Sequence, residues 1–154
     1  MKKLFLVVIA CFLLASCEKG LVYREYKNIP QFSWGQDYEI NFSVDPPQTG
    51  VPYNLMVGLR HLSEIQYGNM AVNMQVTAPS GQSTEEELIL DLRTPDGELI
   101  GEAMGDVTDI EISVKPGYVF EEAGTYNITM THAMQDNPVS GIMEVGLVIK
   151  EATE

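Results

Sequence analysis

The residues "DYEINFSV", from Asp37 to Val44, decide the fold class. Apolar and polar side chains alternate along this stretch without interruption, from Tyr38 through Ile40 and Phe42. A period of two is typical of a β-strand that buries one face and exposes the other to water. No segment of the chain shows a sustained 3.6-residue period, so we predict an all-β protein.

The same alternation recurs along most of the remaining chain. Its apolar positions are Tyr53, Leu55, Val57 and Leu59; Met70, Val72, Met74 and Val76; Leu88, Leu90 and Leu92; Ile110, Ile112 and Val114; Tyr126, Ile128 and Met130; and Val145, Leu147 and Ile149. Proline- and glycine-rich turn signals separate these segments. Seven or eight short strands predict an antiparallel β-sandwich of the jelly-roll or immunoglobulin-like type.

Three finer structural expectations follow from these patterns. We expect residues 53–59, 70–76 and 125–130 to pair with one another around the core. We expect a single helical turn each at residues 101–105 and 133–137, where the alternation stops.

The first residues have the layout of a secretory signal. Lys2 and Lys3 precede an uncharged apolar run from Leu4 to Leu14, and small residues follow. The run is shorter than the roughly 20 apolar residues that a spanning helix needs. The tetrad Leu14 to Cys17 resembles the lipobox of bacterial lipoproteins, which implies cleavage before Cys17 and lipidation of its sulfur. We therefore predict a membrane anchor at Cys17.

This pattern divides the chain into three parts. Residues 1–16 are expected to be the lipoprotein signal peptide, which also removes Cys11. Residues 17–36 are expected to hold the lipidated cysteine, a tether over Glu18 to Lys27 and an entry segment, in which Val22, Tyr23 and Tyr26 could form a short strand. Residues 37–154 are expected to form the β-sandwich domain. Glu18 is balanced by Lys19, which favours an outer-membrane protein that faces the periplasm, with surface display left open.

The net charge of the protein makes some classes of binding partner unfavourable. The formal net charge is −13, and a strongly acidic surface repels nucleic acid and anionic membrane surfaces. We therefore expect no nucleic-acid partner. The run Glu85 to Glu87 is interpreted as a solvated entrance to a strand.

Candidate chemical groups are sparse. His61 and His132 have no second histidine at ligand spacing, and we interpret each as a surface or capping residue near a strand end. Carboxylates gather at Asp96, Glu98, Glu102, Asp106 and Asp109, a set that would suit glycoside hydrolysis only if two of them faced each other across a cleft. No nucleophile elbow or phosphate loop is present, so we predict no catalytic residue, no metal and no cofactor.

Several stretches together resemble one known family. They are "VYREYKNIPQFSW" (22–34), "YNLMVGLRH" (53–61), "TPDGELIGEAMGD" (94–106), "AGTYNITMTHAM" (123–134) and "PVSGIMEVGLVI" (138–149). With the lipobox, they resemble the GldH family of gliding-motility lipoproteins. The resemblance implies a lipoprotein of the cell envelope needed for gliding, with envelope proteins as partners and no known enzymatic activity. The resemblance implies no catalytic residue. It also does not show that the source organism glides, because bacteria that do not glide carry such proteins too.

Two functions are therefore compared. The favoured one is a non-enzymatic, membrane-anchored structural or adaptor subunit, and the alternative is a carbohydrate-binding or carbohydrate-acting sandwich. The alternative requires a carboxylate pair across a cleft or a platform of exposed aromatic side chains, for which the candidates are Trp34, Tyr53, Tyr67 and Tyr118. Trp34 itself is expected to plug the core.

Local signals predict particular contacts. Arg60 interrupts an apolar strand and should pair with a carboxylate across the sheet or lie on its exposed face. Tyr126 should point into the core and bond a neighbouring loop through its hydroxyl. Gly141 and Gly146 indicate a bulge or a close backbone approach in the last strand.

Overall fold

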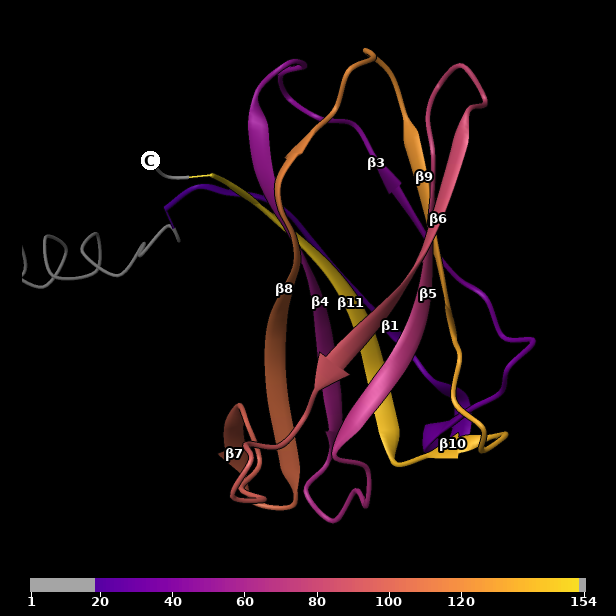
Figure 1. The fold of residues 1–154 in the computed structure, drawn as a ribbon, viewed down its shortest axis with the longest axis vertical. Helices are drawn as coiled ribbons and strands as arrows, with labels where there is room; N and C mark the ends of the chain where they lie inside the picture. The colour runs from indigo at the N-terminus through magenta and orange to yellow at the C-terminus, as the bar shows by residue number, and fades with distance from the viewer. Residues whose placement is uncertain (1–18, 153–154) are drawn as a thin grey trace, which may run out of the picture.

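A computed structural model describes residues 19–152 of the protein, which form two antiparallel sheets packed face to face (Figure 1). One sheet has five strands in the order β1-β11-β4-β8-β7, and the other has four in the order β3-β9-β5-β6. A small β10-β2 pair lies at one end. None of the helices in the described part of the chain is long and apolar enough to cross a membrane. The predicted all-β antiparallel sandwich is confirmed.

The element bounds follow the chain in order. They are β1 (Leu21–Asn28), the 3-10 turn η2 (Pro30–Phe32), β2 (Ser33–Trp34), β3 (Ile40–Val44), β4 (Pro52–Leu62), β5 (Asn69–Thr77), β6 (Ser83–Asp91), β7 (Glu102–Met104), β8 (Val107–Val119), β9 (Tyr126–His132), β10 (Val139–Ser140) and β11 (Ile142–Glu151).

The core lies between the two sheets and uses the apolar positions that the alternation marks. In β3, Ile40, Phe42 and Val44 are buried while the residues between them are exposed. Leu55 and Val57 of β4 are fully buried on the facing sheet. Burial of one such side chain stabilises the fold by about 1.5–3 kcal/mol, so the two inner faces account for the layered architecture.

The predicted strand pairing is correct in one part and wrong in another. β5 pairs with β9, as expected for residues 70–76 and 125–130. β4, which holds residues 53–59, lies instead in the five-stranded sheet between β11 and β8. Alternation identifies the buried side of a strand but not its hydrogen-bonding neighbour, so strands that share a core can belong to opposite sheets.

The expected tether over Glu18 to Lys27 is wrong from Leu21 onward, where the strand considered for Val22, Tyr23 and Tyr26 is present. Leu21–Asn28 is strand β1, which pairs antiparallel with β11 along its length. The carbonyl of Gly20 already accepts a hydrogen bond from the amide of Glu151 at 2.8 Å. β1 lies at the edge of its sheet and is only partly buried, which explains why its apolar alternation is weak.

Three local expectations are also wrong. Residues 101–105 contain the short strand β7 rather than a helical turn, and residues 133–137 contain bends. The first strand of the four-stranded sheet begins at Ile40, and Tyr38 is 44% exposed rather than buried. The one short helix within residues 19–152 is the 3-10 turn at Pro30–Phe32.

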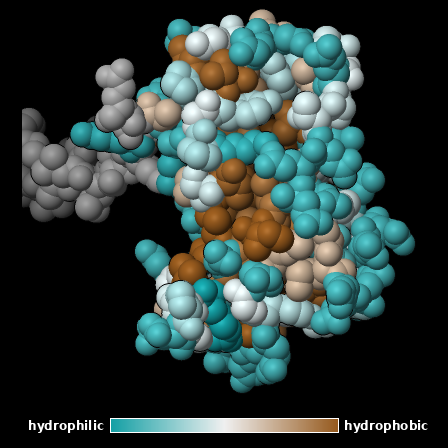
Figure 2. Space-filling view, in the orientation of Figure 1, coloured by the Kyte–Doolittle hydropathy of each residue, from teal (hydrophilic) through white to brown (hydrophobic). Residues whose placement is uncertain are grey.

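One long side of the sandwich, between β8 and the edge strand β6, is bridged by an ion pair. Lys115 of β8 binds Glu86 of β6 across this side. Figure 2 shows apolar side chains reaching the surface near the middle of the same view, framed by hydrophilic ones. Glu85 to Glu87 are exposed in β6, as interpreted from the sequence. Charges at an edge strand discourage pairing with other chains.

Candidate functional site

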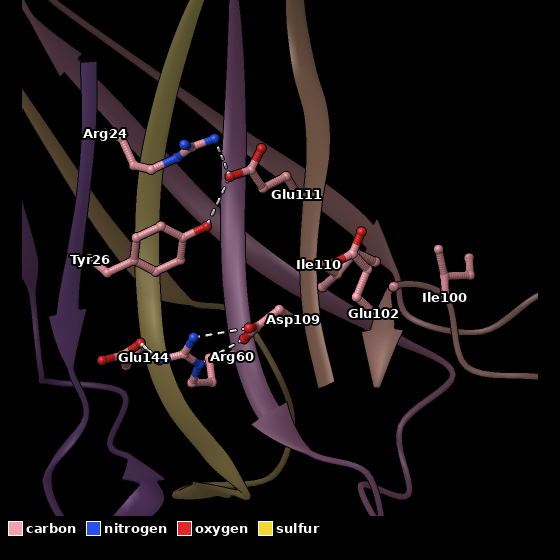
Figure 3. Close-up of a pocket in the computed structure, with 10 residues that line it drawn as sticks. Arg24, Tyr26, Arg60, Ile100, Glu102, Asp109, Ile110, Glu111 and Glu144 are labelled. Atoms are coloured by element: carbon pink, nitrogen blue, oxygen red, sulfur yellow. Dashed lines mark hydrogen bonds and ion pairs between the residues drawn. The ribbon is translucent and has the colours of Figure 1, made fainter. Parts of the chain in front are cut away.

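The outer face of the five-stranded sheet carries the larger of the two described hollows. It has a volume of about 700 Å³ and lies over the middle strands β11, β4 and β8 (Figure 3). Ile100 to Glu102 form its wall on the side of β7. The floor and the remaining walls are formed by side chains that contact one another across four strands.

A tyrosine ring lies in a trough made by two glycines. Gly58 of β4 and Gly146 of β11 are paired neighbours, and the ring of Tyr26 from β1 covers both. A Cβ atom at Gly58 would lie 2.2 Å from the Tyr26 hydroxyl oxygen, and one at Gly146 would lie 2.6 Å from ring carbons. No side chain larger than hydrogen fits under the ring, so the expected close approach at Gly146 is confirmed.

Arg60 of β4 joins the two strands beside it. Its guanidinium makes two hydrogen bonds to Asp109 of β8, at 2.7 and 2.9 Å, and one to Glu144 of β11 at 2.9 Å. Both carboxylates are its register neighbours. The prediction that Arg60 pairs across the sheet is confirmed, and the two-atom contact with Asp109 is the planar geometry that arginine favours.

Glu111 of β8 is a second centre on the same face. Its carboxylate accepts from Arg24 at 2.9 Å, from the Tyr26 hydroxyl at 3.3 Å and from Lys150 at 3.2 Å. These donors come from β1 and β11, so their side chains reach across β4. Three of the protein's 9 lysines and arginines, namely Arg24, Arg60 and Lys150, therefore lie on this face with carboxylate partners.

These contacts shift the pKa values of the groups involved. Burial, followed by the charge of Glu111, raises the pKa of Tyr26 to about 12. Hydrogen bonding to Arg60 lowers the pKa of Asp109, and the same contact raises the pKa of Arg60. Near neutral pH, Tyr26 is therefore a neutral donor and Asp109 a fixed anion.

The arrangement suits static recognition better than proton transfer. A general acid needs a carboxyl whose pKa is raised toward the working pH, whereas that of Asp109 is lowered. Glu102 is the register neighbour of Asp109, which places two carboxylates side by side on adjacent strands. Of the predicted acidic set, these two line the hollow, while Asp96, Glu98 and Asp106 do not.

The predicted aromatic platform is not assembled. Trp34 and Tyr53 are 0% and 2% exposed, and Tyr67 and Tyr118 are half-buried. The Trp34 indole donates to the carbonyl of Tyr38 at 2.9 Å, which confirms its place in the core. Tyr126 is also buried, and its hydroxyl accepts from the amide of Glu122 at 2.8 Å, as predicted.

Both histidines are buried, so the surface half of their interpretation is wrong, but each ring contacts a backbone group near its strand end, as a capping residue would. His61 and His132 are 0% and 1% exposed. Nδ1 of His61 lies 2.8 Å from the carbonyl of Leu62, and Nδ1 of His132 accepts from the amide of Met134. Burial lowers the pKa of His132, which keeps it neutral. Within residues 19–152, no group of three or more histidine, cysteine or acidic side chains is arranged to hold a metal ion.

Two features of this face were missed from the sequence. Gly58 in the middle of a long strand was the available signal for the trough, because glycine in a strand interior marks close approach. The role of Tyr26 had no local signal, since it depends on β1 lying beside β11. The predicted lipidation residue, Cys17, lies outside the described residues.

The described residues thus define an antiparallel β-sandwich module with an ion-paired outer face. The sequence profile described as GldH lipoprotein matches residues 21–149. The chain belongs to this family.

Relatives cover nearly the whole chain. It is 30% identical over 142 residues to a "gliding motility lipoprotein GldH homolog" of Christiangramia forsetii, covering 92% of this chain and 86% of that protein. It is 26% identical over 153 residues to "gliding motility lipoprotein GldH" of Flavobacterium johnsoniae, covering 95% of this chain and 94% of that protein.

Among solved structures, a family GH115 4-O-methyl-alpha-glucuronidase matches with a TM-score of 0.45 and 10% identity, over 90% of this chain and 18% of that protein. This last likeness is too weak to bear on function.

Proposed function

We propose that this protein is a lipid-anchored, non-enzymatic adaptor subunit of a gliding-type assembly in the cell envelope. Membership of the GldH lipoprotein family supports the envelope and gliding parts of this proposal. The observation that carries the adaptor role is the outer face of the five-stranded sheet. Its carboxylates Asp109, Glu111 and Glu144 are each held by a basic side chain, as in a rigid recognition surface.

The anchor would hold the sandwich close to the membrane. Residues 18–20 separate Cys17 from the start of β1 at Leu21. At about 3.3–3.6 Å per residue, they span at most roughly 10–11 Å. A lipid-held domain meets membrane partners at a raised effective concentration, so modest contacts are sufficient.

The proposed location is the outer membrane, with the domain facing the periplasm. The balanced pair Glu18 and Lys19 supports retention on that side. Protease added to intact cells should leave the domain uncut, and permeabilised cells should lose it. Complete digestion without permeabilisation would place the domain on the cell surface instead.

The carbohydrate alternative keeps one of its two discriminating features. It required either a platform of exposed aromatic side chains or a carboxylate pair across a cleft. The buried positions of Trp34 and Tyr53 remove two of the four platform candidates, whereas Glu102 and Asp109 lie side by side at the hollow. Measurable glycan hydrolysis that disappears in Glu102→Gln would restore this alternative.

The proposed anchoring is tested with a pair of cysteine variants in the native host. Cys17→Ala should lose label from a palmitate analogue and fail to be processed by the lipoprotein route. Cys11→Ala is the matched control, because this residue would leave with the signal segment, and it should be labelled like the parent protein. Equal label on Cys17→Ala would refute the anchor.

The adaptor role is tested by function in the same cells. Where surface movement depends on this protein, Cys17→Ala should abolish it, whereas Glu102→Gln should preserve it because no proton transfer is required. Loss of movement in Glu102→Gln together with loss of a measurable hydrolytic activity would contradict the non-enzymatic role.

A further inference from the structure

An aromatic side chain is displayed on an unusual backbone at the end of the sandwich that holds β10. Gln31 and Phe32 have φ values of 55° and 53°, the left-handed region that bulky residues rarely adopt. Phe32 is nevertheless 45% exposed. Strained backbone that presents a side chain to solvent is a recurrent feature of functional sites.

An apolar hollow has one wall that is hydrogen-bonded to the backbone of this aromatic residue. It has a volume of about 420 Å³, and its apolar lining is Leu62, Ile65 and Tyr67, with Gly141 at one wall. The amide of Gly141 donates to the carbonyl of Phe32 at 2.7 Å, and the amide of Leu62 donates to the carbonyl of Gly141 at 2.9 Å. The backbone of Phe32 is therefore bonded to one wall of the hollow, and we call the exposed Phe32 together with this hollow the tip.

The charged groups lining the tip hollow are acidic. Among residues 19–152, Glu64 and Asp136 line it and no lysine or arginine does. Asp136 accepts from the Tyr67 hydroxyl at 3.0 Å, which leaves its charge in place. The Arg93 guanidinium donates to the carbonyls of Gly97 and Ile65, which fixes its position but keeps its positive charge, so the two carboxylates of the hollow outnumber one nearby cation.

The acidic lining of the tip hollow favours some kinds of binding partner over others. A second copy of the chain would also carry a net charge of −13, and an anionic lipid surface would be repelled in the same way. A basic segment of another protein would be attracted, and an apolar side chain on it would fill the hollow. Protein interfaces commonly combine such a buried apolar anchor with charges at the rim.

The tip lies at the opposite end of the molecule from the start of β1. β1 runs from Leu21, opposite Lys150, to Asn28, opposite Glu144, and the chain then enters η2 at Pro30. Figure 1 shows β10 at the bottom and the start of β1 near the C-terminal label at the upper left. This part of the argument rests on the proposed anchor at Cys17, which would point the tip away from the membrane.

We propose that the tip is a docking site for a partner protein that presents an apolar side chain flanked by lysine or arginine. The apolar side chain enters the hollow beside Phe32, and the basic groups face Glu64 and Asp136. This deepens the adaptor function by naming the chemistry of the partner segment.

The test uses the full-length protein from its native envelope in neutral detergent. Fluorescein-labelled peptides Lys-Lys-Phe-Lys-Lys, Glu-Glu-Phe-Glu-Glu and Lys-Lys-Gly-Lys-Lys are titrated, and binding is followed by anisotropy. The first peptide should bind at least about tenfold more tightly than the other two, and its affinity should fall with added salt. Equal binding of the glycine peptide would overturn the apolar part of the proposal, and equal binding of the acidic peptide would overturn its charge.

Variants locate the site. Phe32→Asn removes the ring but tolerates the left-handed backbone, so it should keep or raise thermal stability while weakening binding at least fivefold. Glu64→Gln should weaken binding and reduce its salt dependence. The matched control Met104→Ala removes a side chain that is 77% exposed on β7 and should bind like the parent protein. Equal weakening in Met104→Ala would refute the location.

Two further measurements exclude the other occupants. Self-association that is lost in Phe32→Asn would assign the tip to a second copy, and binding to phosphatidylglycerol vesicles that is lost in the same variant would assign it to lipid. Either result would overturn the proposal. The measurements separate this proposal from the anchor, because peptide binding in detergent does not require Cys17, while palmitate labelling does not require Phe32.

Discussion

The two outer faces of the sandwich differ sharply in chemistry. The five-stranded sheet presents Arg24, Arg60, Glu111 and their partners in a network across four strands. In the other sheet, the outward positions of β3, β9 and β5 are uncharged; they are Asn41, Ser43, Asn127, Thr129, Thr131, Ala71, Asn73, Gln75 and Thr77. The charged residues of that outer face, Glu85, Glu87 and Asp91, lie on the edge strand β6. The first face therefore joins opposite charges across its middle strands, whereas the second has short neutral side chains there and acidic ones at its edge.

The difference shows how a sheet face becomes a single unit. Long side chains on the five-stranded sheet reach past one strand to the next, and the glycine trough lets Tyr26 cross both β11 and β4. Short side chains on the other face bond at most to a direct neighbour, as Thr129 does to Asn41 at 2.7 Å. We therefore expect substitutions to be coupled on the first face and independent on the second.

The largest expected effect is at the trough. In Gly146→Ala the new Cβ would collide with ring carbons near the root of the Tyr26 side chain, so the ring must leave and its contact with Glu111 is lost. Overpacking of this kind costs about 1–3 kcal/mol. Urea denaturation of the full-length protein measures it. Gly58→Ala should cost less, because its Cβ meets the far end of the same side chain.

The control is the same substitution without the ring. In a Tyr26→Ala background, Gly146→Ala should become stabilising by about 0.5–1 kcal/mol, since alanine lowers the entropy of the unfolded chain. An equal loss of stability in both backgrounds would mean that the trough is not what requires glycine.

The next effect concerns the charge network. Arg60→Gln leaves Asp109 and Glu144 without their shared cation, and because all three groups are partly exposed the expected loss is about 1 kcal/mol. Gln75→Ala on the four-stranded sheet is the comparison and should stay within about 0.5 kcal/mol. A larger loss for Gln75→Ala than for Arg60→Gln would reverse the proposed contrast.

The sequence predicted correctly which side chains are buried but not which strands pair, for a physical reason. Alternation identified Leu55, Val72 and Ile128 as core residues because a period of two depends on the strand alone. It failed to place β4 and β5 in different sheets, since sheet partners depend on long-range pairing.

For the candidate site, too, the need of a side chain for a partner was predictable, but the identity of the partner was not. Arg60 was predicted to need a carboxylate because a charged group interrupts an apolar strand. Which carboxylates it binds follows from the register of β4 with β8 and β11, and no local pattern gives that register. Tyr26 and Gly58 were missed because a trough exists only after three strands are aligned.

Acid should weaken one face and not the other. The hydrogen bonds from Arg60 lower the pKa of Asp109 below its usual value of 3.8. The folded state therefore gains stability from this group above about pH 3.8, and the gain is lost as pH falls through the lowered value. The stability difference between the parent protein and Arg60→Gln should shrink between pH 7 and pH 3 in urea titrations. A difference that grows in acid would show that Asp109 is not the partner that matters.

The smallest expected effect tests the neutral middle strands of the four-stranded sheet. Thr129→Val removes the hydroxyl that bonds Asn41 at 2.7 Å, but the bond is exposed, so water can replace it. Valine also favours strands. The net change should stay within about 0.5 kcal/mol, with no coupling to Asn41→Ala in a double-mutant cycle. A coupling energy above about 1 kcal/mol would show that short polar side chains are also energetically coupled. The contrast between the two faces would then be explained by charge, and not by the length of the side chains.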